Sequence, residues 1–102
     1  MSYELAFHEV ALKEWKHLDA SIKTQFKKQL AKRLQNPHIP SARLRGLEMQ
    51  NIYKIKLWEA GYRLVYEVDD QTVRVLVLAV GRRDKNQAYR HISQRRELPS
   101  SS

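Results

Sequence analysis

Apolar residues recur at helical spacing in the first third of the chain. Two such sets follow one another: Ala11, Leu12, Trp15 and Leu18, and then Ile22, Phe26, Leu30 and Leu34. Because a spacing of three or four residues brings side chains to one face of an α-helix, these sets predict a helical hairpin that begins near His8. We expect Asp19 or Ser21 to cap the second helix and Pro37 to end it, since proline disfavours helical geometry in the residue before it.

Alternating or branched apolar residues predict four strands around this hairpin. The expected strands are Tyr3 to Phe7, Ile52 to Leu57, Tyr62 to Val68 and Val73 to Val80. The last three are separated by short segments rich in turn formers, which predicts an antiparallel meander. The final strand is nearly continuous in branched apolar residues, a pattern typical of a strand covered on both faces. We expect Gly81 to allow a sharp exit from it, and residues 85–96 have helical composition.

These elements predict an α+β fold in a compact single domain with the order β-α-α-β-β-β-α. The fold would be a mainly antiparallel four-stranded sheet, with the N-terminal helical hairpin packed on one face and a short C-terminal helix. A chain of 102 residues leaves no room for a second core. We expect the domain to span residues 1–97 and residues 98–102 to be a disordered tail.

Two lysines share one face of the strand Ile52 to Leu57. Side chains alternate between the faces of a strand, so Lys54 and Lys56 point one way and the apolar residues beside them point the other way. A hairpin with an even loop would also place Lys56 opposite Arg63, although like charges at such positions are mildly destabilising. This arrangement favours a functional role, and exposed lysines that protect a sheet edge are the alternative. Trp58, beside the turn, is expected either to pack the hairpin or, less readily, to stack on a base.

Charge and composition narrow the class of partner. The chain has 19 lysines and arginines against 11 aspartates and glutamates, with a net charge of +8 and a pI of about 10.0. This excess predicts a polyanionic partner, with nucleic acid first, and a solvated face or a docking surface for an acidic protein as alternatives. The absence of cysteine excludes disulfides and thiolate metal sites and suits the reducing cytoplasm.

Neither a membrane partner nor a cofactor is expected. The longest apolar run, Val75 to Val80, is far shorter than the roughly 20 residues that a membrane helix needs. The N-terminus carries the acidic Glu4 instead of the basic start of a signal peptide. The four histidines lack the spacing of metal ligands.

Five segments carry a family resemblance by their order and spacing. They are Ala11-Leu12-Lys13-Glu14-Trp15, Leu44-Arg45-Gly46, Tyr53-Lys54-Ile55-Lys56-Leu57, Gly61-Tyr62-Arg63-Leu64-Val65-Tyr66, and Val80-Gly81-Arg82-Arg83 with Tyr89 six residues beyond. Together they resemble the RelE branch of the RelE/ParE toxins of bacterial toxin–antitoxin pairs, over residues 3 to about 92. The resemblance implies two N-terminal helices on one face of a sheet, and cleavage of messenger RNA lying in the ribosomal A site.

The resemblance also implies the site residues. The catalytic positions fall on Lys54, Lys56, Arg63, Arg83 and Tyr89, and RNA-binding positions fall on Arg45, Arg82 and Lys85. Lys85 stands where a relative has arginine, so the charge is kept without the bidentate geometry. Compared with that relative, two residues are also inserted between Gly46 and Tyr53.

The chemistry of RNA cleavage fits such a cationic set. Attack by the 2′-hydroxyl needs a base, a cation to stabilise the charge on pentacoordinate phosphorus, and an acid for the leaving 5′-oxygen. Neighbouring cations favour the phenolate of a tyrosine and lower the pKa of a lysine, so Tyr89 or Lys54 could be the base. Arg83 would stabilise charge, since guanidinium hardly releases a proton. As alternatives, Arg63 and Arg83 could form surface salt bridges, and Tyr89 could be a half-buried helix residue.

The implied partners are a RelB-like antitoxin, the 70S ribosome with its 16S rRNA, and the A-site message. Operator DNA would be bound only through the antitoxin complex. The sequence leaves two other functions open: a ParE-type toxin that blocks DNA gyrase without nuclease activity, and a non-catalytic basic module that only binds nucleic acid or acts as a co-repressor.

Overall fold

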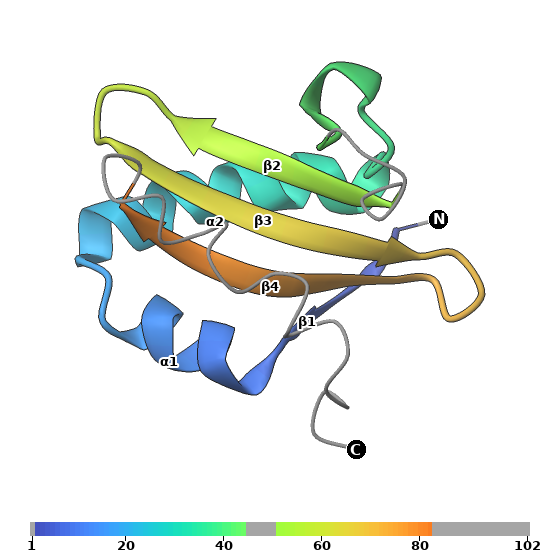
Figure 1. Ribbon diagram of the computed structural model, residues 1–102, viewed down its shortest axis with the longest axis horizontal. Helices are drawn as coiled ribbons and strands as arrows, with labels where there is room; N and C mark the ends of the chain where they lie inside the picture. The colour runs from blue at the N-terminus through green and yellow to red at the C-terminus, as the bar shows by residue number, and fades with distance from the viewer. Residues whose placement is uncertain (1, 45–50, 83–102) are drawn as a thin grey trace.

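The computed structural model describes residues 2–44 and 51–82, which form a four-stranded sheet, two α-helices and one short 3-10 helix (Figure 1). In chain order these are β1 (Glu4–Phe7), α1 (Glu9–Lys16), α2 (Ala20–Gln35), the 3-10 helix (Pro40–Ala42), β2 (Ile52–Leu57), β3 (Tyr62–Asp69) and β4 (Arg74–Arg82). The predicted α+β class and the order β-α-α-β-β-β are therefore confirmed. The expected C-terminal helix and the tail at 98–102 lie outside the described residues.

The sheet is mixed, with the strand order β1-β4-β3-β2. β4 pairs with β3 and β3 with β2 in antiparallel fashion, whereas β1 lies parallel to β4. The helical hairpin between β1 and β2 covers one face of the sheet, as Figure 1 shows. We call the opposite face the open face.

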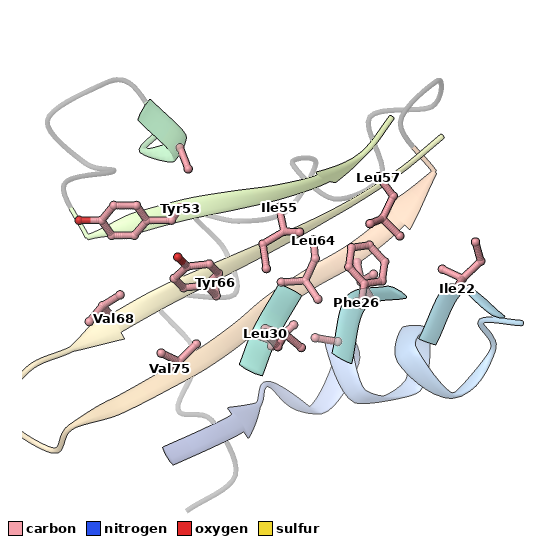
Figure 2. Packing of buried hydrophobic residues seen from close by; sticks show 14 residues of the cluster. Ile22, Phe26, Leu30, Tyr53, Ile55, Leu57, Leu64, Tyr66, Val68 and Val75 are labelled. Carbon is pink, nitrogen blue, oxygen red and sulfur yellow. The ribbon is translucent and has the colours of Figure 1, made fainter. Parts of the chain in front are cut away.

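The main core lies between the sheet and the helices (Figure 2). From α2, the buried side chains of Ile22, Phe26 and Leu30 point to the sheet, which confirms the predicted helical stripe. A smaller cluster lies on the open face and consists of Ile52, Val65, Leu78 and Ala79, with Leu44 and Leu76 packed against it. Side chains of β4 enter both clusters, so this strand is covered on both faces, as its composition predicts.

The ends of β4 differ from the expectation. Val73 was expected to begin the strand but lies in the preceding turn with a φ of 53°, a left-handed conformation that branched residues rarely adopt. The turn is set by the Asp69 carboxylate, which accepts hydrogen bonds from the backbone N–H groups of Gln71 and Thr72. At the other end, Gly81 does not terminate the strand, because it pairs with Arg63 and β4 continues for another residue.

A β-bulge interrupts the pairing of β3 with β4. Val65 pairs with Ala79 and the next residue, Tyr66, pairs with Val77, so Leu78 is the extra residue. Leu78 and Ala79 consequently both belong to the cluster on the open face. From this point the alternation of side chains along β4 is shifted by one residue.

The helix ends follow the sequence signals only in part. The buried imidazole of His8 caps α1, and its Nδ1 accepts a hydrogen bond from the Val10 backbone N–H at 3.2 Å. Asp19 is the N-cap residue of α2, but its side chain makes no capping hydrogen bond, so the expected cap contact is absent. The helix ends at Gln35, two residues before Pro37, as predicted.

Candidate active site

Three of the predicted catalytic residues lie together on the open face. Lys56 pairs directly with Arg63, as the predicted hairpin register requires, and Arg63 pairs on its other side with Gly81. Lys54 lies one pleat away on β2, opposite the buried Val65 of the open-face cluster. All three cationic side chains are partly exposed. We call Lys54, Lys56 and Arg63 the cationic row.

The cationic row is an unfavourable arrangement for an isolated sheet. Directly opposite residues of an antiparallel pair have Cβ atoms about 5 Å apart, and like charges there cost a few tenths of a kcal/mol or more. On the β4 side, the residue that pairs with Arg63 is Gly81, which has no side chain. A polyanion bound on this face would offset that repulsion.

Trp58 extends the row beyond β2. Trp58 is 64% exposed. The favoured expectation, that this residue packs against the hairpin, is therefore not met. The ammonium group of Lys56 lies over the indole ring, 4.5 Å from its centroid. An indole face attracts a cation electrostatically, and this contact restricts where the Lys56 ammonium can lie.

A hydrogen-bond network behind the sheet fixes β2. The Arg33 guanidinium of α2 donates from Nη1 to the Lys54 carbonyl at 3.2 Å and to the Tyr66 hydroxyl at 2.9 Å. That hydroxyl donates in turn to the Pro37 carbonyl at 2.8 Å. Burial raises the pKa of Tyr66 above 10.0, with the Arg33 hydrogen bond acting in the opposite direction. Arg33 thus ties the backbone of a candidate catalytic residue to the helical layer.

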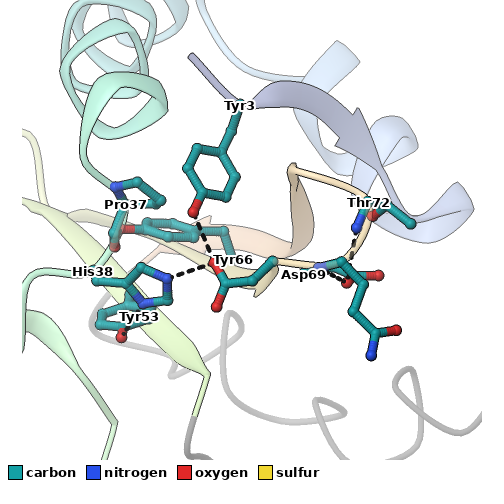
Figure 3. Close-up of polar contacts among 9 residues, drawn as sticks. Tyr3, Pro37, His38, Tyr53, Tyr66, Asp69 and Thr72 are labelled. Carbon is teal, nitrogen blue, oxygen red and sulfur yellow. Dashed lines mark hydrogen bonds and ion pairs between the residues drawn. The ribbon is translucent and has the colours of Figure 1, made fainter. Parts of the chain in front are cut away.

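A second polar cluster joins the loop after α2 to the turn between β3 and β4 (Figure 3). His38 lies 2.8 Å from Asp70 through Nε2 and 2.9 Å from the Tyr53 hydroxyl through Nδ1. The Tyr3 hydroxyl donates to the same Asp70 oxygen at 2.7 Å. The hydrogen bonds from His38 and Tyr3 lower the pKa of Asp70, and the bond to Asp70 raises the pKa of Tyr3.

The other predicted site residues are placed differently or lie outside the described part of the chain. Arg82 is exposed at the end of β4, where it pairs with Tyr62, whose side chain packs against the helix-side core. The register therefore puts Arg82 on the face opposite the cationic row. Arg45, Arg83, Lys85 and Tyr89 lie outside the described residues.

Sequence reasoning missed the residues that hold the site. The apolar periodicity of α2 gives Arg33 no special place, and His38, one of the four histidines, was considered only as a metal ligand. Their partners lie 15 to 33 residues away in the chain, so no local spacing signals the contacts. Across residues 2–44 and 51–82, no three His, Asp or Glu side chains are grouped as a metal site would require. No helix in these same segments has the length and apolar character to span a membrane.

Comparison with known proteins gives the class of this molecule. A family model described as the ParE toxin of the type II toxin–antitoxin system parDE matches residues 5–87. The mRNA interferase toxin RelE of Escherichia coli K12 is 47% identical over 89 residues, which cover 87% of this chain and 92% of the relative. The chain belongs to the RelE/ParE family of type II toxins.

Solved structures agree with this assignment. A double mutant of the E. coli toxin RelE in the free state is 44% identical, with a TM-score of 0.85, and the match covers 96% of this chain and 100% of that one. The toxin in the intact E. coli RelBE toxin–antitoxin complex is 48% identical, with a TM-score of 0.76, over 79% of this chain and 96% of that chain. Within the family, the similarity is therefore to RelE-type toxins, as the sequence segments predict.

Proposed function

We propose that this chain is the toxin of a type II toxin–antitoxin pair and acts as an endoribonuclease that cleaves messenger RNA in the ribosomal A site. The cationic row on the open face is the observation that carries the proposal. Lys54, Lys56 and Arg63 occupy the positions that the RelE resemblance assigns to catalysis, and the strand register brings them together. The 47% identity to a protein named an mRNA interferase supports the same activity.

In the proposed reaction, the 2′-oxygen of the message attacks the adjacent phosphorus, and the bond from phosphorus to the 5′-oxygen breaks. The proton of the 2′-hydroxyl passes to a base, Tyr89 or Lys54, and the departing 5′-oxygen takes a proton from an acid. The products are a 2′,3′-cyclic phosphate, which can open to a 3′-phosphate, and a 5′-hydroxyl. Lys56, Arg63 and Arg83 stabilise the negative charge that builds on the phosphoryl oxygens.

The proposal includes three partners. A RelB-like antitoxin would neutralise the toxin, which the similarity to the toxin in the E. coli RelBE complex supports. The 70S ribosome with its 16S rRNA would present the message, because so small an open face offers little surface to fix a flexible RNA by itself. Operator DNA would be bound through the antitoxin complex, and the whole cycle would take place in the cytoplasm.

The test is cleavage of ribosome-bound message by purified toxin, with the RNA ends identified. We expect cyclic or 3′-phosphate ends at the A-site codon. Arg63→Ala should slow single-turnover cleavage on the order of 10²-fold, as loss of an oxyanion donor does. The control Lys28→Ala removes one exposed cation of α2, which lies behind the sheet, and should change the rate little.

The family model names ParE, so a gyrase-blocking toxin is the alternative to test in parallel. Under that alternative the purified chain would inhibit DNA supercoiling by gyrase and leave the A-site message intact. Products ending in a 3′-hydroxyl would instead exclude attack by the 2′-oxygen.

A further inference from the structure

A hollow of about 460 Å³ adjoins the cationic row at the start of β2. Among the residues that the structure describes, its lining is formed by Pro40, Ser41, Arg43, Leu44 and Lys54. A volume in this range is typical of sites for small ligands. None of the first four residues is assigned a role by the proposed reaction, and Lys54 is the residue that the hollow shares with the cationic row.

The wall of this hollow is held by backbone contacts to β2. Arg43 forms an antiparallel bridge with Tyr53, and the Leu44 N–H donates to the Ile52 carbonyl at 2.9 Å. The preceding turn is closed by a hydrogen bond from the Arg43 N–H to the Pro40 carbonyl at 3.3 Å. The wall is thus positioned by the edge strand that carries Lys54.

The hollow opens on the same face as the cationic row. Leu44 packs against the cluster of Ile52 and Val65 on the open face, and Lys54 points to that face by strand alternation. Lys54 and Lys56 are two residues apart, roughly 7 Å along the strand. A group bound between Arg43 and Lys54 would therefore be a near neighbour of a phosphate held over the cationic row.

The lining has the chemistry that a nucleotide requires. Arg43 is exposed and offers a planar guanidinium that can hold a phosphate through two hydrogen bonds, with the Lys54 ammonium as a second cation. Ser41 offers a hydroxyl for a ribose or base edge, and Pro40 and Leu44 offer apolar surface for the face of a base. Cations, one hydroxyl and apolar surface in one hollow match the three parts of a nucleotide.

We propose that this hollow is a subsite for one nucleotide of the message, next to the scissile bond, with its phosphate held by Arg43. The inference rests on the proposed nuclease function and adds a binding position to it. In this arrangement, Arg43 contacts a flanking nucleotide, whereas the reacting atoms are contacted by the cationic row. The subsite anchors the RNA beside the bond to be cut, so that its binding energy aligns the attacking 2′-oxygen.

The test combines an Arg43 variant with a message that lacks one phosphate charge. Messages carry a methylphosphonate at either phosphate flanking the scissile one, and single-turnover kcat/KM is measured on programmed ribosomes. For the wild type we expect a loss of about tenfold at one of the two positions. Arg43→Ala should lose a similar factor on the unmodified message and nothing further on that modified message, since both changes remove the same contact. Arg43→Lys should recover part of the loss.

The possible outcomes distinguish a failure of the nucleotide subsite from a failure of the nuclease function on which it rests. Suppose that the wild type cleaves, but that the losses from Arg43→Ala and from the methylphosphonate multiply, or that Arg43→Ala cleaves as fast as the wild type. Either outcome refutes the subsite but leaves the nuclease function standing. If Arg43→Ala weakens only antitoxin binding, the hollow takes an acidic protein segment instead, and the subsite is again refuted. If the wild type does not cleave, the nuclease function itself fails and the subsite falls with it. Lys28→Ala serves as the charge-matched control, and thermal melts show whether each variant is folded.

Discussion

Removing the hydroxyl of Tyr66 tests the network that holds β2 to the helices. The side chain is fully buried, and its hydroxyl donates to Pro37 while accepting from Arg33. In Tyr66→Phe, the Pro37 carbonyl loses this donor but keeps the hydrogen bond from the Ile39 N–H at 3.1 Å. The Arg33 guanidinium likewise keeps its bond to the Lys54 carbonyl. The mutation therefore removes one neutral hydrogen bond, worth about 0.5–1.5 kcal/mol, and one hydrogen bond to a charged group, worth about 1.5–3 kcal/mol.

We therefore expect Tyr66→Phe to lower the free energy of unfolding by about 2–3 kcal/mol. For a chain of 102 residues, the unfolding entropy converts this to a fall in Tm of roughly 10–15 °C. The matched control is Tyr3→Phe, which removes the same hydroxyl from a half-buried ring whose partner is the exposed Asp70. The control should lose less than about 1 kcal/mol.

Urea and thermal unfolding followed by circular dichroism would measure both variants. The difference between wild type and Tyr66→Phe should also narrow at high pH. Because burial raises the pKa of Tyr66 in the folded state, the neutral phenol stabilises the fold below pH 10.0, and this contribution is lost as the pH rises through the folded pKa. Equal stabilities of Tyr66→Phe and Tyr3→Phe at neutral pH would refute the importance of the network.

Three further predictions concern a turn, an ion pair and the indole beside the cationic row. Val73→Asn should raise Tm by a few °C, because asparagine tolerates the left-handed conformation that costs a branched residue about 1 kcal/mol; a lower Tm would show that valine packing outweighs the strain. The hydrogen bond from His38 lowers the pKa of Asp70 in the folded state. The charged Asp70 carboxylate therefore stabilises the fold above pH 3.8, its ordinary pKa, and this stabilisation is lost as the pH falls through the lower folded pKa. Acid unfolding curves of Asp70→Asn should lack this component, and curves parallel to wild type would contradict it. Trp58→Ala should slow cleavage on the order of two- to fivefold through freer motion of Lys56, with Trp58→Phe intermediate and Tm nearly unchanged; a normal rate would exclude a positioning role.

The sequence predicted the elements whose signals are local. The periodicity of α2 and the alternation of β2 depend only on which face of each element is buried, so Ile52–Leu57 and the end of the helix before Pro37 were predicted correctly. The pairing of Lys56 with Arg63 followed from the length of one turn. The hairpin alone was therefore enough to predict that two members of the cationic row, Lys56 and Arg63, lie side by side.

What the sequence did not reveal depends on contacts between distant segments. The branched side chain of Val73 favours a strand by propensity, but the Asp69 carboxylate organises the turn and holds this residue outside it. Arg33 reaches Lys54 and Tyr66 across the layer between helix and sheet, 21 and 33 residues away in the chain. No pattern within a helix distinguishes such an arginine from its solvated neighbours.

The bulge in β4 explains how the open face accommodates the cationic row. Val75 and Val77 pack on the helix side, and strict alternation from them would place Val80 on the open face, beside Arg63. The extra residue at the bulge shifts the alternation, so that Val80 joins the helix-side core and Gly81 takes the position opposite Arg63. A branched apolar side chain is thereby kept away from the cations, and a glycine stands in its place. Gly81, which was expected to allow the chain to leave the sheet, therefore lies within β4 instead. Because it has no side chain, no apolar group lies next to Arg63 at this position.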